Sequence, residues 1–142
     1  MRKIQAAAAL LVLCLILSGC SLPWSTFDMG EVLPPILDEF TWLPLLDSVT
    51  VTRVSDGAEV TVSGTDTELL YGCFEGNPCT RRSGTVTEMY VLSFTMVDAS
   101  DIRPDAVVGE YRGTVCISVD GFRYRPVSSS FDLAYLEGLF AS

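Results

Sequence analysis

The residues with the widest range of chemistry in this sequence are its five cysteines, at positions 14, 20, 73, 79 and 116. A thiol can form a disulfide, bind zinc, attack a substrate as a thiolate or accept a lipid chain. The sequence contains no histidine, so the commonest general base near neutral pH and the commonest metal ligand are both missing. The residues that flank each cysteine therefore decide which chemistry applies to it.

Cys20 follows a segment with the three-part layout of a secretory signal. A charged start at residues 1–3 precedes an apolar run over residues 6–17, and the run ends in the tetrapeptide Leu17-Ser18-Gly19-Cys20. The run holds about a dozen apolar residues, whereas a helix needs roughly 20 to cross a hydrocarbon core. We therefore predict that residues 1–19 are a signal peptide and not a permanent transmembrane helix.

This tetrapeptide resembles the lipobox of bacterial lipoproteins, in which a branched apolar residue and two small residues precede a cysteine. Small side chains let a peptidase approach the backbone, and the thiol is the group that accepts the diacylglyceryl chain. The resemblance implies cleavage between Gly19 and Cys20 and acylation of Cys20, for example with palmitate. Two or more acyl chains give stable anchoring, so we expect a lipid anchor at the extracytoplasmic face of the cell membrane. The alternative is an ordinary signal peptide in which the cysteine stands by chance.

Three cysteines remain once Cys14 and Cys20 are assigned to the signal and the anchor. Cys73 and Cys79 enclose a short loop, so a local disulfide is one alternative in an oxidising exterior, and free structural thiols are the other. A reactive thiolate beside Arg81 and Arg82 is disfavoured without a histidine. The spacing of the three cysteines does not match a zinc site.

The charged residues disfavour other classes of function. After removal of the signal, seven arginines face eighteen acidic residues, and such a surface repels the phosphate backbone of nucleic acids. Asp98, Asp101 and Asp105 lie in one turn region, but they lack the spacing of an EF-hand calcium loop, so we expect a solvated loop. We expect Arg123 and Arg125 to pair internally with Glu59 or Glu88 and not to receive an anionic partner. The sequence shows no nucleophile–base pair, metal motif or cofactor motif, and we expect no enzyme, metal or cofactor.

The chain between the anchor and the domain is expected to be a tether over residues 20–47. It holds four prolines and no sustained period, but its four aromatic residues are too apolar for a flexible linker, so we expect them to pack against the domain. These prolines and aromatic residues are Pro23, Trp24, Phe27, Pro34, Pro35, Phe40, Trp42 and Pro44.

Residues 48–142 are predicted to form one small α+β domain with an antiparallel sheet. Two Asp-Gly pairs between alternating runs predict two hairpins with two-residue loops, at residues 56–57 and 120–121. The first loop would pair Val51 with Val62, and the second would pair Val119 with Phe122. A long strand over residues 85–97 and a strand over residues 107–111 complete the sheet.

Two helices are expected to pack on this sheet. The first follows the first hairpin, with a capping box formed by Thr65 and Glu68 and with a buried face formed by Leu69, Leu70, Cys73 and Phe74. A closing helix follows Asp132, with Phe131 and Leu136 as a hydrophobic staple and with Leu136, Leu139 and Phe140 on its buried face.

The hairpin and helix motifs VTVTRVSDG, VTVSGTDTELL, ISVDGFRY and FDLAYLEGLF extend over residues 49–140. They resemble small uncharacterised lipoproteins of Gram-positive gut bacteria and are loosely similar to YhfM-like domains. The resemblance implies a fold and an envelope location, but no activity. We expect a non-catalytic binding or accessory module of the cell envelope, with a protein or peptide partner. A purely structural lipoprotein is the alternative, and a hydrolase that uses carboxylates is the least favoured class.

Overall fold

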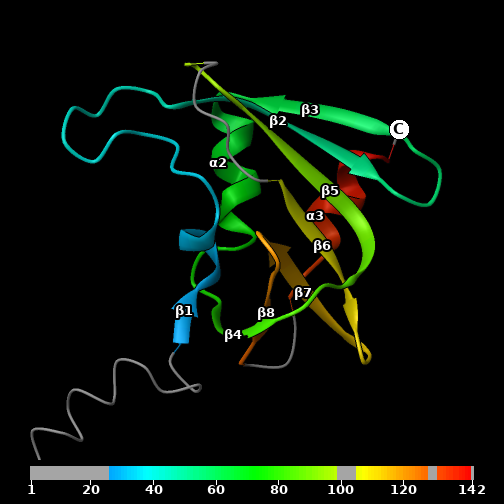
Figure 1. Ribbon diagram of the computed structural model, residues 1–142. Coiled ribbons are helices and arrows are strands. Elements are labelled where there is room, and N and C mark those ends of the chain that lie inside the picture. Colours follow the sequence, from blue (N-terminus) through cyan, green and yellow to red (C-terminus); the bar gives the residue numbers. More distant parts are fainter. Residues whose placement is uncertain (1–25, 99–104, 128–130, 142) are drawn as a thin grey trace, which may run out of the picture.

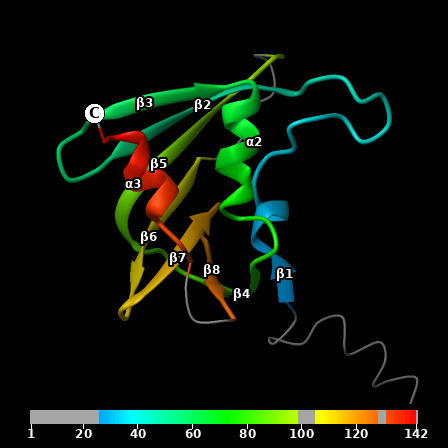
Figure 2. The ribbon, with the colours of Figure 1, turned by 180° about the vertical axis from the view of Figure 1, so that it is seen from behind.

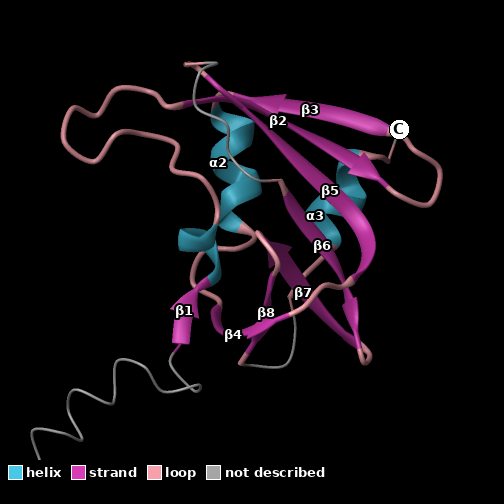
Figure 3. Ribbon diagram, in the orientation of Figure 1, coloured by secondary structure: helices cyan, strands magenta, loops and turns pink. Residues whose placement is uncertain are grey.

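The structure, a computed structural model, describes residues 26–98, 105–127 and 131–141. These residues form an antiparallel sheet of eight strands with two short α-helices on one face (Figures 1 and 3), which is the predicted α+β class. The strand order is β1-β4-β8-β7-β6-β5-β2-β3. The strands are β1 (Thr26–Asp28), β2 (Leu46–Arg53), β3 (Glu59–Ser63), β4 (Pro78–Ser83), β5 (Thr87–Met96), β6 (Ala106–Tyr111), β7 (Thr114–Val119) and β8 (Phe122–Pro126). The helices are the 3-10 helix η1 (Met29–Val32), α2 (Thr65–Gly72) and α3 (Ala134–Leu139).

The hydrophobic core lies between the inner face of the sheet and the helices. Alternate residues of a strand project to the same face, and the sheet contributes the fully buried side chains of Val51, Leu92 and Val108. Leu70 of α2 and Leu136 of α3 are also fully buried. Figure 2 shows both helices in front of the same face of the sheet. Burial of these apolar side chains is the main favourable contribution to folding.

The two predicted hairpins differ in their loops. In the first, β2 and β3 pair Val51 with Val60, so the predicted pairing of Val51 with Val62 is wrong. The loop holds four residues, because the Arg53 N–H donates to the Ala58 carbonyl across it. In the second hairpin, β7 and β8 pair Val119 with Phe122 around Asp120 and Gly121. A register shift of two residues keeps each side chain on its face, so the valines of the first hairpin still share one face.

Residues 26–47 belong to the fold, so the expected tether is wrong for this part of the chain. β1 is an edge strand beside β4, and Met29 and Leu33 lie in the hydrophobic core. Phe27 packs edge-on against another aromatic ring, but Phe40 and Trp42 are exposed, contrary to the expected packing. Trp24 lies outside the described residues.

Strand β4 was not predicted, and it links two distant parts of the sheet. Only residues 84–86 separate it from β5, although β8, β7 and β6 lie between these strands in the sheet. The end of this connection and the start of β5 pack against β6 at Gly109, where an added Cβ would lie 2.6 Å from the Val86 side chain and 2.2 Å from the Thr87 carbonyl oxygen. This close approach excludes a side chain at position 109.

The helices begin differently from the expectation. Gly64, with φ of 59°, is the N-cap of α2, and no side chain caps the helix, so the Thr65 and Glu68 capping box is wrong. Leu69 is exposed, while Leu70 and Tyr71 are buried. At α3, the Asp132 carboxylate accepts the Ala134 N–H at 2.8 Å. Phe131 and Leu136 are buried, and Leu139 and Phe140 are partly buried against the same core.

Candidate functional site

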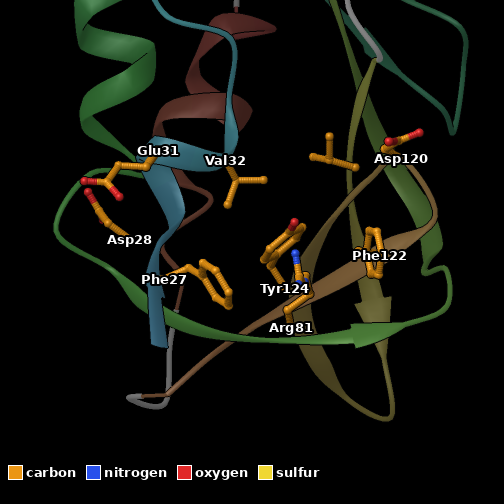
Figure 4. Close-up of a pocket in the computed structure, with 9 residues that line it drawn as sticks. Phe27, Asp28, Glu31, Val32, Arg81, Asp120, Phe122 and Tyr124 are labelled. Atoms are coloured by element: carbon orange, nitrogen blue, oxygen red, sulfur yellow. The ribbon is translucent and has the colours of Figure 1, made fainter. Parts of the chain in front are cut away.

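A pocket of about 440 Å³ opens between β1 and η1 on one side and the β7–β8 turn on the other (Figure 4). This volume lies within the usual range for small-molecule sites, about 300–1,000 Å³. Its lining comes from segments far apart in the sequence and consists of Phe27, Asp28, Glu31, Val32, Arg81, Val119, Asp120, Phe122 and Tyr124. We call it the Arg81 pocket.

Strands β4 and β8 supply the floor of the Arg81 pocket. Arg81 pairs with Tyr124 across the two strands, and Phe122 pairs with Ser83. Because side chains alternate along a strand, Arg81 shares the inner face with Cys79, which is fully buried. The sheet therefore turns an arginine toward the same side as the core, at the place where the core opens to solvent.

The Arg81 guanidinium lies against two aromatic rings. Its central carbon is 5.1 Å from the ring centroid of Phe27 and 4.8 Å from that of Phe122. Phe27 in turn packs edge-on against Tyr124, with 6.1 Å between the ring centroids. A cation over an aromatic face is attracted by the negative charge of that face. The rings therefore hold the guanidinium in place without neutralising it.

Carboxylates surround Arg81 without pairing with it. Figure 4 shows Asp28 and Glu31 at one rim of the pocket and Asp120 at the other, with their carboxylates directed away from Arg81. The Asp28 carboxylate accepts the Gly76 N–H at 2.9 Å, which fixes its position. Arg81 forms no ion pair with any residue that the structure describes. The pocket thus combines one unpaired cation, three anions and apolar walls.

Cys79 lies behind the aromatic wall, directly opposite Phe27 in the sheet. Its thiol donates to the Phe27 carbonyl at 3.2 Å. Burial, and next the nearby charge of Asp28, raise the pKa of the Cys79 thiol to about 11. Arg81 and Arg82 therefore do not activate this thiol, because a reactive cysteine needs a lowered pKa.

The other two cysteines in the described part of the chain, Cys73 and Cys116, are also free thiols. The Cys73 thiol donates to the Leu69 carbonyl and not toward Cys79, so the disulfide between Cys73 and Cys79 is not formed. Burial raises the pKa of Cys73 and of Cys116 as well. Cys20 and Gly19, the expected lipidation and cleavage residues, lie outside the described part of the chain.

The expected pairing of Arg123 and Arg125 with glutamates is not formed. The Arg123 guanidinium lies 3.4 Å from the ring centroid of Tyr111 and donates to the Thr85 carbonyl at 3.3 Å. Neither arginine forms an ion pair with Glu59 or Glu88. Both project to the outer face of the sheet, opposite the Arg81 pocket, and their charges lower the pKa of Cys116 against the dominant effect of its burial.

The turn region with Asp98 and Asp105 includes Asp101, which lies outside the described residues. Within residues 26–98, 105–127 and 131–141, no three cysteine, aspartate or glutamate side chains are grouped so that they could hold a metal ion.

Sequence reasoning missed the Arg81 pocket as a site. Arg81 was considered only as a neighbour of Cys79, and Phe122 and Tyr124 were treated as one face of a hairpin. The available signal was an arginine two residues from a cysteine within an extended segment, because this spacing puts both side chains on one face of a strand. This signal can be recognised only if residues 78–83 are known to form a strand, and their composition did not predict β4.

Searches against protein-family models, curated protein sequences and solved structures find no match to this chain. In the described part of the chain, no helix is both long and apolar enough to span a bilayer.

Proposed function

We propose that this chain is a lipid-anchored extracytoplasmic lipoprotein that acts as a non-catalytic binding module of the cell envelope. Cys20 carries the lipid, and the Arg81 pocket receives the ligand. The observation that carries the binding role is the Arg81 guanidinium, held between two aromatic rings without a carboxylate partner. Unlike Arg123 and Arg125 on the outer face of the sheet, Arg81 lines a pocket, so its charge is available to a ligand that enters there.

The charges of the pocket indicate a zwitterionic ligand. A carboxylate would bind Arg81, since a guanidinium forms two parallel hydrogen bonds with that group. An ammonium group would face Asp28 and Glu31, or Asp120 on the opposite side. Phe27 and Phe122 would contact the apolar part of the ligand. A short peptide has these three features and fits a volume of about 440 Å³.

The proposal assigns no bond-making step to the pocket. The nearest thiol, Cys79, has a pKa of about 11 and stays protonated at neutral pH. The residues that line the pocket include no cysteine, serine or threonine that could act as a nucleophile. Binding is therefore better supported than hydrolysis.

The proposed anchor lies close to the folded domain. Five residues separate Cys20 from Thr26, the first residue of β1, and six residue steps can span at most about 20 Å. An acylated Cys20 would thus hold the domain against the bilayer surface.

The ligand proposal is tested by equilibrium dialysis of the lipidated chain in detergent with radiolabelled alanylalanine. Loss of a hydrogen bond to a charged group costs about 1.5–3 kcal/mol, so Arg81→Gln should weaken binding roughly 10- to 100-fold. Arg125→Gln, on the opposite face of β8, is the matched control and should bind as the wild type does. The amidated dipeptide should lose its contact with Arg81 and bind as weakly to the wild type as to Arg81→Gln.

Two results would contradict the proposal in different ways. Equal binding by wild type and Arg81→Gln would remove the pocket from the function. No binding of alanylalanine or of its capped forms would favour the purely structural lipoprotein. The anchor is tested separately by metabolic labelling with palmitate, in which the wild type should take up label and Cys20→Ser should not.

A further inference from the structure

A loop next to η1 presents large apolar side chains to solvent. Phe40, Trp42 and Leu43 are 87%, 74% and 63% exposed, and Leu37 at the base is 42% exposed. We call residues 37–43 the aromatic loop. Aromatic side chains of this size bring a large apolar area to any contact they make, so their exposure in a folded loop indicates a contact surface.

Hydrogen bonds within the aromatic loop fix its shape. Leu37 forms a bridge with Pro44, and the Asp38 N–H donates to the Leu43 carbonyl at 2.9 Å. The Asp38 carboxylate accepts the N–H groups of Phe40 and Thr41 at 2.8 and 2.9 Å. The apolar side chains are therefore displayed by a loop that already satisfies most of its own backbone donors. Such internal pairing reduces the cost of moving a loop from water into a less polar medium.

The aromatic loop lies on the same side of the molecule as β1. Figures 1 and 2, seen from opposite directions, both show the loop at the upper end and β1 at the lower end of one side, and the β2–β3 loop on the other side. The proposed anchor at Cys20 precedes β1 by six residues. A chain of that length, at most about 20 Å, keeps this side of the domain near the bilayer.

The chemistry of the loop fits the boundary between headgroups and acyl chains. Tryptophan and phenylalanine favour that boundary, where an aromatic ring meets apolar and polar surroundings at once. The described chain before Arg53 contains no basic residue, so attraction to anionic headgroups cannot drive the contact. A lipid anchor makes the contact intramolecular in effect, and weak apolar insertion then suffices.

We infer that the aromatic loop inserts into the bilayer interface as a second membrane contact beside the acylated Cys20. The inference rests on the proposed lipid anchor. With both contacts, the domain lies on the membrane in one orientation: the aromatic loop faces the lipid, and the β2–β3 loop faces away from it.

Native fluorescence tests this inference because the chain has two tryptophans. In the lipidated Trp24→Phe variant, Trp42 is the only tryptophan and is excited selectively over the five tyrosines. The variant is placed in vesicles of zwitterionic phosphatidylcholine. Vesicles with brominated acyl chains should quench the fluorescence of Trp42. The emission of Trp42 should also shift to the blue relative to that of the same lipidated protein in buffer without vesicles. High salt should leave the quenching unchanged.

A reporter on the opposite side of the domain supplies the matched control. Val54 is exposed in the β2–β3 loop, and Val54→Trp in a background of Trp24→Phe and Trp42→Phe should show no quenching by the same lipids. Equal quenching of both reporters, or none of either, in a protein that carries palmitate would overturn the inference and leave the lipid anchor intact. Absence of palmitate would overturn the proposed anchor itself.

Discussion

Two adjacent leucines of α2 provide a stringent test of how the helix packs. Leu70 is 0% exposed and Leu69 is 59% exposed, although the sequence predicted that both are buried. The same substitution at the two positions therefore removes the same atoms from a core and from a surface. Leu70→Ala should destabilise the protein strongly, and Leu69→Ala should have little effect.

The magnitudes follow from burial. Truncation of a buried leucine to alanine costs about 3–5 kcal/mol, through lost transfer free energy and the cavity that remains. Leu69→Ala loses little buried area and gains a few tenths of a kcal/mol in helix propensity, so a change within about 0.5 kcal/mol is expected. For a domain of this size, 3 kcal/mol corresponds to a fall in Tm of roughly 10 °C or more.

Urea unfolding followed by circular dichroism measures the difference directly. The two variants should differ in midpoint and share one slope, because the slope reports the surface exposed on unfolding. Equal midpoints for Leu69→Ala and Leu70→Ala would refute the assigned face of α2. The test also concerns the Arg81 pocket, because η1 forms part of its wall. Tyr71 of α2 donates its hydroxyl to the Pro34 carbonyl at 2.5 Å and so holds the segment after η1.

Three further predictions concern separate parts of the fold. Gly109→Ala places a methyl group 2.2 Å from the Thr87 carbonyl oxygen of β5 and should cost at least about 2 kcal/mol. Gly72→Ala, at the end of α2, meets nothing within 4 Å and should leave Tm unchanged or raise it slightly, because alanine has the higher helix propensity. Iodoacetamide at pH 8, followed by mass spectrometry, should modify the half-buried Cys73 faster than Cys79, whose buried thiol has a pKa of about 11; equal rates would contradict the burial of Cys79. A hydrogen bond from Arg53 lowers the pKa of Asp56 from 3.8 to about 2. The contribution of the ionised Asp56 to stability is therefore present above pH 4 and lost as the pH falls through about 2. Asp56→Asn should flatten the decline in stability over that range, and an unchanged decline would contradict the ion pair.

Sequence periodicity located most of the sheet because strand alternation is a local property. The runs of β2, β3, β7 and β8 alternate apolar and polar residues, and those of β5 and β6 are rich in valine and aromatic residues. The predicted positions of these strands match the structure to within a few residues. The turn at Asp120 and Gly121 has positive φ at both residues, as a two-residue loop requires. The loop that contains Gly57 also has an Asp-Gly pair, but it closes over four residues, so the pair alone does not fix loop length.

The edge strand β1 and its neighbour β4 could not be predicted in this way. Pro78 and two consecutive arginines mask the alternation in β4, and β1 has only three residues. Both strands are held by pairing with distant segments, which leaves no local pattern. The Arg81 pocket was missed for the same reason, since Phe27, Arg81 and Phe122 come together only through these strands.

The segment before β2 connects the proposed membrane contact to the pocket. η1 contributes Glu31 to the wall of the Arg81 pocket, and only residues 33–36 separate it from the aromatic loop. This connection is rigid, because Leu33 is buried in the core and the Pro34 carbonyl accepts the Tyr71 hydroxyl. A rigid connection transmits orientation and not opening or closing. Insertion of the aromatic loop would therefore set the direction in which the pocket faces from the membrane, while the shape of the pocket stays the same.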